Sequence, residues 1–361
     1  LGATSREWYV LDVRPPFIMT FGEGKNAYEV PRAGTIELAA ETTAGIVNGL
    51  KTLRQLIRVR DDQIYARGCF IEDYPSMSFR GIHFFTGRGA RELQTRIVRN
   101  VLGPMKINQL VYQVDYLRWD SMPEGAHNER YAMEKEDARA VAEEAWRQGI
   151  EVIPLVNTFG HSEWLIDNPV LRHLADNPGH PYAYDPSNPE VYRLCEKIYE
   201  EAIELFRPRI FHIGHDEVTL HDFPYNERNR AIGAGQLIIR DTLHYYHWLK
   251  ARGLRTAMWG DMLLGPTEAG PDACLAPSDE EAKRRRDALP RDILITDWHY
   301  EGAPIEKFTS LQLLSRAGFD TVASTWATPS NVVRFAKVAE SLDLDDPTTG
   351  GQPTDYHCGT P

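Results

Sequence analysis

The sequence predicts an α/β fold of the (β/α)8 barrel type, preceded by a small α+β domain. From residue 76 onward, short apolar runs alternate with amphipathic helical segments, and seven such strand–helix units follow one another. This alternation indicates parallel strands with right-handed helical crossovers, and so many units favour a closed barrel over a doubly wound sheet. Residues 1–75 follow a different pattern. We therefore divide the chain into an N-terminal domain, residues 1–75, and a barrel domain, residues 76–361.

The N-terminal domain combines strand-like and helix-like segments. Residues 9–13 and 35–38 alternate apolar and polar side chains as strands do. Residues 42–59 change to the period of an amphipathic helix, and either threonine at its start could act as its N-cap. The helix face that we expect to pack on the sheet consists of Ile46, Leu50, Leu53 and Ile57.

The barrel strands are expected at residues 81–85, 109–114, 152–156, 210–213, 256–259, 293–297 and 321–324. The clearest amphipathic helices cover residues 135–148, 189–206, 236–252 and 331–342. No eighth strand is evident, because the tail from residue 345 is polar and rich in glycine, proline and threonine. We therefore expect a barrel that is irregular or incomplete at its eighth unit. Active sites of this fold gather where the strands end, so polar residues directly after each strand are the candidates.

Composition excludes several classes of protein. The chain has 361 residues, 40 Lys and Arg against 52 Asp and Glu, and a net charge of −12, which argues against binding to a nucleic acid backbone. No apolar run reaches the length of roughly 20 residues that a membrane helix needs. The four cysteines form no CxxC pair. The chain begins with Leu1 and shows no signal-peptide pattern, so the compartment stays open. The sequence does not indicate an oligomeric state either.

The strongest local signal is an apolar strand that runs into two adjacent carboxylates, Asp216 and Glu217. Successive strand side chains point to opposite faces, so both acids can reach one pocket only where the strand ends and the backbone turns. Two like charges this close raise the pKa of at least one carboxyl, which suits a general acid. The alternative is a solvated pair of acids that caps the next helix.

The surroundings of this pair resemble glycoside hydrolase family 20, the β-N-acetylhexosaminidases. The run 212–217, His-Ile-Gly-His-Asp-Glu, is similar to the family motif His-x-Gly-Gly-Asp-Glu, with His215 at the second glycine. Further segments resemble family motifs in the same order: Gly45–Leu56, Asp73–Pro75, Phe79–Gly81, Met105–Asn108, Gly160-His161 and Asp185–Pro189. The resemblance covers roughly residues 40 to 265, and an ordered set of motifs is more specific than any one of them.

The resemblance implies a retaining exo-β-N-acetylhexosaminidase that acts on terminal β-linked GlcNAc or GalNAc. In this family the substrate's own 2-acetamido oxygen is the nucleophile, so the reaction passes through an oxazolinium intermediate. By this resemblance Glu217 is the general acid and then the base. Asp216 orients the acetamido N–H and stabilises the positive intermediate. The alternative is a carbohydrate-binding barrel of the same family that has lost catalysis.

The resemblance also implies roles for residues around the two acids. Arg80, before the first strand, would bind two sugar hydroxyls, although a surface ion pair is the alternative. His161 would support the acid through a second carboxylate, for which Asp115 is the candidate.

Aromatic residues at successive strand ends indicate a sugar pocket. Trp259 and Asp261 resemble the family's Trp-x-Asp or Trp-x-Glu, and Trp298 and Trp326 end the next two strands. A single tryptophan is more often a packing residue, but an indole face also packs well on a pyranose ring or an acetamido methyl group. Tyr300 is the candidate for holding the acetamido carbonyl.

Other chemistries find less support. The family's Glu-x-Asp in the third strand reads Leu155-Val156-Asn157 here, so this strand departs from the family pattern. His212 and His215 lie three apart on a strand, which places them on opposite faces and argues against a shared metal ion. No nucleophile elbow and no phosphate-binding loop is present. We therefore expect no metal and no cofactor, and an N-acetylhexosamine glycan as the partner.

Overall fold

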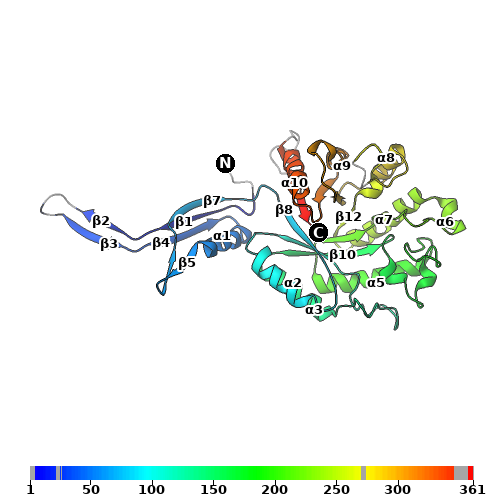
Figure 1. Ribbon diagram of the computed structural model, residues 1–361, viewed down its shortest axis with the longest axis horizontal. Coiled ribbons are helices and arrows are strands. Elements are labelled where there is room, and N and C mark those ends of the chain that lie inside the picture. The colour runs from blue at the N-terminus through cyan, green and yellow to red at the C-terminus, as the bar shows by residue number, and fades with distance from the viewer. Residues whose placement is uncertain (1–4, 22–24, 26, 270–273, 345–356, 361) are drawn as a thin grey trace.

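The computed structural model describes residues 5–21, 25, 27–269, 274–344 and 357–360. Its larger part is a closed barrel of parallel strands in the order β10-β11-β12-β13-β14-β15-β8-β9 (Figure 1). The barrel strands are β8 (Phe79–Phe85), β9 (Gln109–Gln113), β10 (Glu151–Thr158), β11 (Ile210–Gly214), β12 (Arg255–Trp259), β13 (Leu294–Trp298), β14 (Asp320–Ser324) and β15 (His357–Thr360). The predicted barrel is confirmed.

The eighth strand corrects the expectation of an incomplete barrel. β15 pairs in parallel with β14 on one side and with β8 on the other, so it closes the ring. It lies in the tail from residue 345, most of which is outside the described residues. Its sequence, His-Cys-Gly-Thr, has neither the apolar run nor the alternation that reveals a strand without its neighbours.

Helices cover the outside of the barrel (Figure 1). They are α2 (Arg91–Ile97), α3 (Lys135–Arg147), α4 (Glu163–Ile166), α5 (Pro189–Phe206), α6 (Glu227–Ile232), α7 (Ala234–Lys250), α8 (Asp279–Ala288), α9 (Ser310–Arg316) and α10 (Pro329–Leu344). The longest is α5, which Asn188 caps by accepting from the Glu190 N–H, with Pro189 at the first helical position. Its buried face packs against β10, and its Tyr199 ring contacts Phe211 of β11, the strand that the candidate acids follow.

Side chains fill the interior of the barrel in layers. Phe79, Ile153, Ala257, Leu294 and Val322 form one apolar cluster. Leu155 and Trp259 lie two residues further along their strands than Ile153 and Ala257, and they join the next cluster. Because strand side chains alternate with a period of two, each inward position starts a new layer. The barrel is therefore a packed core whose upper layer carries the first aromatic residues of the site.

The N-terminal unit is a three-stranded antiparallel sheet with one helix (Figure 1). The sheet consists of β4 (Thr35–Ala40), β1 (Tyr9–Arg14) and β7 (Cys69–Asp73), and α1 (Thr43–Leu56) packs against it. Two hairpins extend from it, β2 (Phe17–Phe21) with β3 (Tyr28–Arg32), and β5 (Ile57–Arg60) with β6 (Gln63–Ala66). The division into two domains at residue 75 stays a prediction.

Helix α1 is present as expected, but its predicted packing face is only partly right. Leu53 packs against the core of the sheet, whereas Leu50 is 51% exposed and Ile57 lies beyond the helix in β5. The helix also approaches the sheet through glycines: a Cβ on Gly45 would lie 2.3 Å from the Trp8 carbonyl oxygen, and one on Gly49 would lie 2.3 Å from Leu38 Cδ1. A glycine face allows closer packing than a leucine face, and hydrophobic periodicity alone does not reveal it.

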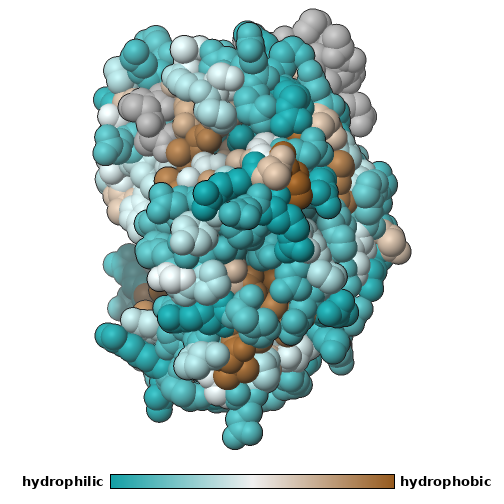
Figure 2. Space-filling view, turned by 90° about the vertical axis from the view of Figure 1, so that its right-hand side faces the viewer, coloured by the Kyte–Doolittle hydropathy of each residue, from teal (hydrophilic) through white to brown (hydrophobic). Residues whose placement is uncertain are grey.

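The face of the barrel that Figure 2 shows is largely hydrophilic. Figure 2 shows that the hydrophobic residues on this face form small and separate patches. Among the described residues, no helix combines the length and the apolar character needed to cross a membrane.

Candidate active site

A pocket of about 270 Å³ lies at the C-terminal end of the barrel strands. It brings together seven of the predicted site residues: His161, Asp216, Glu217, Trp259, Trp298, Tyr300 and Trp326. Four further residues line it that were not predicted as contacts, namely His83, Phe85, Gln113 and Asn157. All of these side chains lie at or just after strand ends, as expected for this fold.

The two acids share the pocket because the backbone turns sharply after β11. Gly214, His215 and Glu217 all have positive φ, at 75°, 70° and 50°. Conformations of this kind are natural for glycine and strained for other residues. The turn after β10 packs closely against this segment, since a Cβ on Gly160 would lie 2.3 Å from the Asp216 carbonyl oxygen. The two neighbouring turns thus place His161 beside both acids.

Asp216 has a carboxylate oxygen that is left without a partner. Its Oδ1 atom is buried and accepts no hydrogen bond from the described residues. Burial disfavours the charged form and raises the pKa of Asp216 to about 6, although the nearby positive charge of His161 opposes this shift. A buried polar atom without a partner is uncommon in proteins, and in a pocket it indicates a place for a ligand's donor group.

Glu217 forms an ion pair with His161, whose Nε2 lies 2.9 Å from Glu217 Oε2 and 3.5 Å from Asp216 Oδ2. Burial by itself would lower the pKa of His161, but the hydrogen bond to Glu217 and the surrounding carboxylates raise it to about 9. The same hydrogen bond lowers the pKa of Glu217. The elevated carboxyl pKa that we expected in this pair therefore belongs to Asp216, and burial is its main cause.

Asp261 lies beneath the pocket and contacts two of the residues that line it. It is fully buried, and its carboxylate accepts from the Glu217 backbone N–H at 2.8 Å and from the Trp298 indole N–H at 3.2 Å. Burial, together with the charge of Asp216, raises the pKa of Asp261 to about 8. Because Asp261 is not among the residues that line the pocket, the structure corrects the expected sugar contact: its contacts hold the acid's backbone and one tryptophan.

Asp115 has a similar supporting position. It accepts from the Asn157 backbone at 2.8 Å, from the Asn157 side chain at 3.1 Å and from Gln113 Nε2 at 2.7 Å. Burial raises the pKa of Asp115 to about 7. We expected His161 to support the acid through Asp115, but His161 bonds to Glu217 directly, and Asp115 instead orients two amides that line the pocket.

The four unpredicted residues follow a simple rule. His83 and Phe85 continue the inward positions of β8 that begin at Phe79, and Gln113 and Asn157 do the same for β9 and β10. The period-two alternation of these strands was the signal that could have identified them.

Burial also lowers the pKa of His83 to about 4, so its ring is neutral near pH 7.

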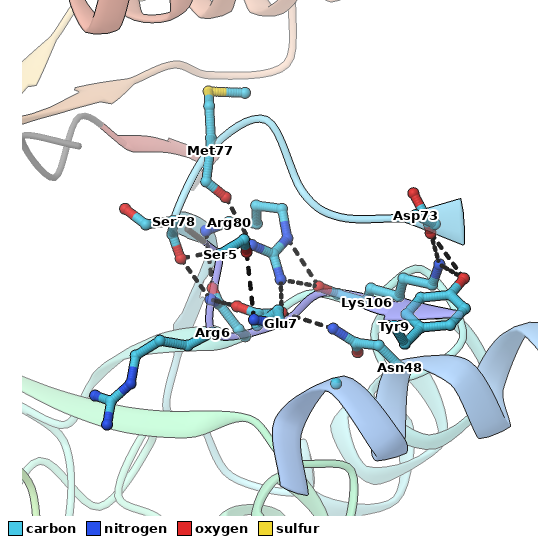
Figure 3. A network of polar contacts seen from close by, with 12 residues as sticks. Ser5, Arg6, Glu7, Tyr9, Asn48, Asp73, Met77, Ser78, Arg80 and Lys106 are labelled. Atoms are coloured by element: carbon cyan, nitrogen blue, oxygen red, sulfur yellow. Dashed lines mark hydrogen bonds and ion pairs between the residues drawn. The ribbon is translucent and has the colours of Figure 1, made fainter. Parts of the chain in front are cut away.

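Arg80 lies at the opposite end of the barrel, among contacts with the N-terminal unit (Figure 3), which corrects the expectation that it binds sugar. It is the second residue of β8, and Phe85, five residues later and thus about 16 Å along the strand, is the one that lines the pocket. Its guanidinium donates to Glu7 Oε2 at 2.6 Å, to the Lys106 carbonyl at 2.9 and 3.0 Å, and to the Met77 carbonyl at 2.7 Å. Arg80 therefore joins the N-terminal unit to the bottom of the barrel.

The aromatic residues form one wall from the floor of the pocket to its rim. Trp259 and Trp298 are each only 7% exposed, whereas Trp326 is 48% exposed. Tyr300 links them, stacking on Trp298 at a centroid distance of 4.8 Å and meeting Trp326 edge-on at 5.1 Å. Burial and the nearby carboxylates raise the pKa of Tyr300, so its hydroxyl stays a neutral donor. The wall offers apolar faces for a ring and one hydroxyl group.

Residues 104–328 match a family profile described as glycosyl hydrolase family 20, catalytic domain. Similar proteins include beta-hexosaminidase 1 of Coccidioides posadasii, 25% identical over 81% of this chain and 51% of that protein. Beta-hexosaminidase subunit A2 of Dictyostelium discoideum is 28% identical over 52% of this chain and 37% of that protein. The chain thus spans about half the length, or less, of these relatives.

Solved structures resemble the fold over nearly the whole chain. An exo β-N-acetylglucosaminidase from Vibrio harveyi in complex with N-acetylglucosamine has a TM-score of 0.71 at 17% identity, covering 100% of this chain and 59% of that one. A chitobiase from Flavobacterium johnsoniae has a TM-score of 0.66 at 20% identity, covering 88% and 46%. At these identities the structures show the shared fold alone.

Proposed function

We propose, from the premise that this chain belongs to glycosyl hydrolase family 20, that it hydrolyses terminal β-linked N-acetylhexosamine residues of glycans or glycosides. The hexosaminidase names of the relatives support this substrate class. One observation carries the proposal: beside Glu217, in a pocket walled by aromatic rings, the buried Oδ1 of Asp216 has no partner in the part of the chain that the structure describes. An acetamido N–H is the kind of donor that this oxygen lacks.

The proposed mechanism uses the substrate's acetamido group as the nucleophile. The acetamido oxygen forms a bond to the anomeric carbon while the glycosidic bond breaks, and Glu217 gives a proton to the leaving oxygen. Asp216 accepts a hydrogen bond from the acetamido N–H, and its negative charge stabilises the positive charge of the oxazolinium ring. Water then attacks the anomeric carbon as Glu217 takes its proton, the ring reopens, and the two inversions together retain configuration.

The contact between His161 and Glu217 supplies the proton. Before substrate binds, this proton resides on His161, because the ion pair raises the pKa of His161 and lowers that of Glu217. A sugar that displaces water from the pocket destabilises the two charges and raises the pKa of Glu217. The proton can then cross the 2.9 Å between Nε2 and Oε2 and be available to the leaving group.

The walls of the pocket suit the other parts of an N-acetylhexosamine. We assign the aromatic wall of Trp259, Trp298 and Tyr300 to the acetamido methyl group and the ring face, with the Tyr300 hydroxyl donating to the acetamido carbonyl. Gln113 and Asn157, held by Asp115, present neutral amides to the remaining hydroxyls.

The test is release of 4-nitrophenol from its β-GlcNAc and β-GalNAc glycosides by the purified chain. We expect turnover that Glu217→Gln lowers by about 10²–10⁴-fold, since it removes the general acid. Glu204→Gln, an exposed acid on α5, is the matched control and keeps wild-type kcat. Measurable sugar binding without turnover would overturn the proposal and favour a non-catalytic binding barrel.

A second measurement addresses the nucleophile. A thiazoline mimic of the bicyclic intermediate should inhibit at low concentration, and a 4-nitrophenyl β-glucoside, which lacks the acetamido group, should be nearly inert. Equal turnover of the glucoside and the GlcNAc glycoside would contradict substrate-assisted catalysis.

A further inference from the structure

His215 points away from the pocket and into the layer between the barrel and its helices. Its side chain has no exposed surface, and its Nε2 lies 2.9 Å from Oδ1 of Asp241, a buried residue of α7. Its Nδ1 lies 3.1 Å from the Ile213 carbonyl oxygen and 3.4 Å from Thr158 Oγ1. The residue directly before the two acids is therefore tied to a helix on the outside of the barrel.

Asp241 is the centre of this buried network. Its Oδ1 accepts from the Tyr184 hydroxyl at 2.8 Å, and its Oδ2 accepts from the Tyr192 hydroxyl at 2.7 Å. A carboxylate without solvent is stable only when hydrogen bonds or an opposite charge satisfy it, and here two hydroxyls and one imidazole surround it. The ring of Phe159 adds an edge contact to His215 at 5.9 Å. The imidazole is thus fixed from several sides.

The backbone conformation of the 214–217 turn explains why a side-chain contact from His215 to Asp241 is needed. His215 has a φ of 70°, and Glu217 has a φ of 50°, so two residues with Cβ atoms hold a left-handed conformation within one turn. Such conformations persist only where surrounding contacts enforce them. A glycine at 215 would adopt this φ without strain, but it would leave the turn without a side chain that attaches it to α7.

We propose that His215 is a positioning residue, whose buried contact with Asp241 holds the 214–217 turn so that Asp216 and Glu217 face the pocket. His215 touches no substrate in this scheme and acts only through the two acids. The inference rests on the proposed function for its kinetic consequence. The anchoring itself is a property of the fold and can be measured separately.

The kinetic test compares His215→Gly, Asp241→Asn and the double variant on 4-nitrophenyl β-GlcNAc. Each single variant should lower kcat by about 10- to 100-fold, because small displacements of catalytic groups have effects of this size. KM should change little, and the double variant should be no slower than the slower single one, as for residues that act as a unit. His215→Gln, which keeps a polar side chain that can reach Asp241, should recover part of the lost kcat.

The matched control is Glu196→Gln. Glu196 contacts His244 at 2.8 Å between α5 and α7, so it has the same chemistry between neighbouring helices but lies away from the turn. It should lower Tm and leave kcat unchanged. Wild-type kcat in both His215→Gly and Asp241→Asn, or losses that multiply in the double variant, would overturn the inference.

Hydrogen–deuterium exchange separates this inference from the proposed function. The backbone amides of residues 210–222 should exchange faster in His215→Gly and in Asp241→Asn than in wild type, and not in Glu196→Gln. If the wild-type protein turns over no N-acetylhexosaminide, the proposed function is wrong. The exchange rates still show whether the contact between His215 and Asp241 holds the turn. If His215→Gly does not fold, Asp241→Asn, which keeps the shape of the side chain, provides both readouts. Unchanged exchange in Asp241→Asn would contradict the anchor.

Discussion

The two ends of the barrel each carry a buried or half-buried carboxylate in a polar network, Glu7 at the bottom and Asp216 at the top, and the two carboxylates differ in how completely they are satisfied. At the bottom, the Glu7 carboxylate accepts from Arg80, Asn48 and Asn108, so its two oxygens have three donors (Figure 3). At the top, Asp216 Oδ1 is buried and has no partner among the described residues. A carboxylate with a full set of donors stabilises a junction, whereas one with a free buried oxygen in a pocket leaves an atom for a ligand. The comparison therefore separates the structural role of Glu7 from the proposed role of Asp216.

The pKa values differ in the same way. Burial would raise the pKa of Asp73 at the bottom, but hydrogen bonds from Lys106 and Tyr9 outweigh it and lower the value. At the top, burial raises the pKa of Asp216, Asp115 and Asp261 to about 6, 7 and 8. His161 is the cation that faces the acids of the pocket, and its closest contact is with Glu217. Shifted carboxyls that lie in or beneath one pocket are typical of functional sites.

The largest effect in this comparison is expected from Asp216→Asn. Loss of one preorganised charge next to the reacting centre should lower kcat by about 10²–10³-fold. Oδ1 accepts no hydrogen bond from any residue within the described ranges, so Tm should stay close to wild type. The measurement is kcat on the 4-nitrophenyl glycoside together with thermal unfolding. An unfolded variant would mark Asp216 as structural and remove the distinction between the two ends.

The next effect concerns pH. Asp216 must be ionised to stabilise a cation, so kcat should rise as the pH increases through about 6. His161 must keep its proton, so kcat should fall as the pH increases through about 9. The raised pKa of His161 also gives stability that is complete below pH 6.5 and is lost as the pH rises through about 9.

His161→Gln sharpens that pH prediction. Without the imidazolium, the hydrogen bond that lowers the pKa of Glu217 is lost, so this pKa rises and Glu217 itself determines the alkaline limb. The alkaline limb of the pH–kcat profile should therefore move below 9. A profile whose alkaline limb is unchanged in the variant would show that another group determines it.

The smallest effect on catalysis is expected from Arg80→Met. The variant breaks the ion pair with Glu7 at the bottom of the barrel and should reduce the free energy of unfolding by about 1.5–3 kcal/mol, the range for hydrogen bonds to charged groups. Values of kcat/KM should remain near wild type. A folded Arg80→Met protein with a large loss of kcat/KM would show instead that Arg80 contributes to the site, as the family resemblance implied.

Much of the fold followed from patterns between near neighbours in the chain. The alternation of strands and helices identified seven barrel strands, and the period of residues 42–59 identified α1. The packing face of α1 was predicted only in part, because Leu53 packs on the sheet as expected but the rest of the face depends on how closely Gly45 and Gly49 let the sheet approach. β15 was missed because its four residues become a strand only through pairing with β14 and β8.

The site residues also divide into those that a local sequence feature identified and those that depend on the packing of distant segments. Asp216 and Glu217 were recognised because an apolar strand followed by two acids is a local feature, and the end of a barrel strand faces the pocket. Arg80 was misplaced although its motif is also local, because it lies at the start of its strand and so at the other end of the barrel. Gln113 and Asn157 became site residues only when β9 and β10 lay side by side and Asp115 oriented both amides.

Neighbouring residues alone thus decided the barrel class, the order of its units and the position of the two acids, because periodicity and strand ends are properties of a short stretch of chain. Closure of the barrel decided which side chains meet, which carboxyl is left without a partner, and where the strained turn is anchored. Those outcomes depend on contacts such as His161 with Glu217 and His215 with Asp241, whose members are far apart in the chain and approach each other only when the strands and helices pack together.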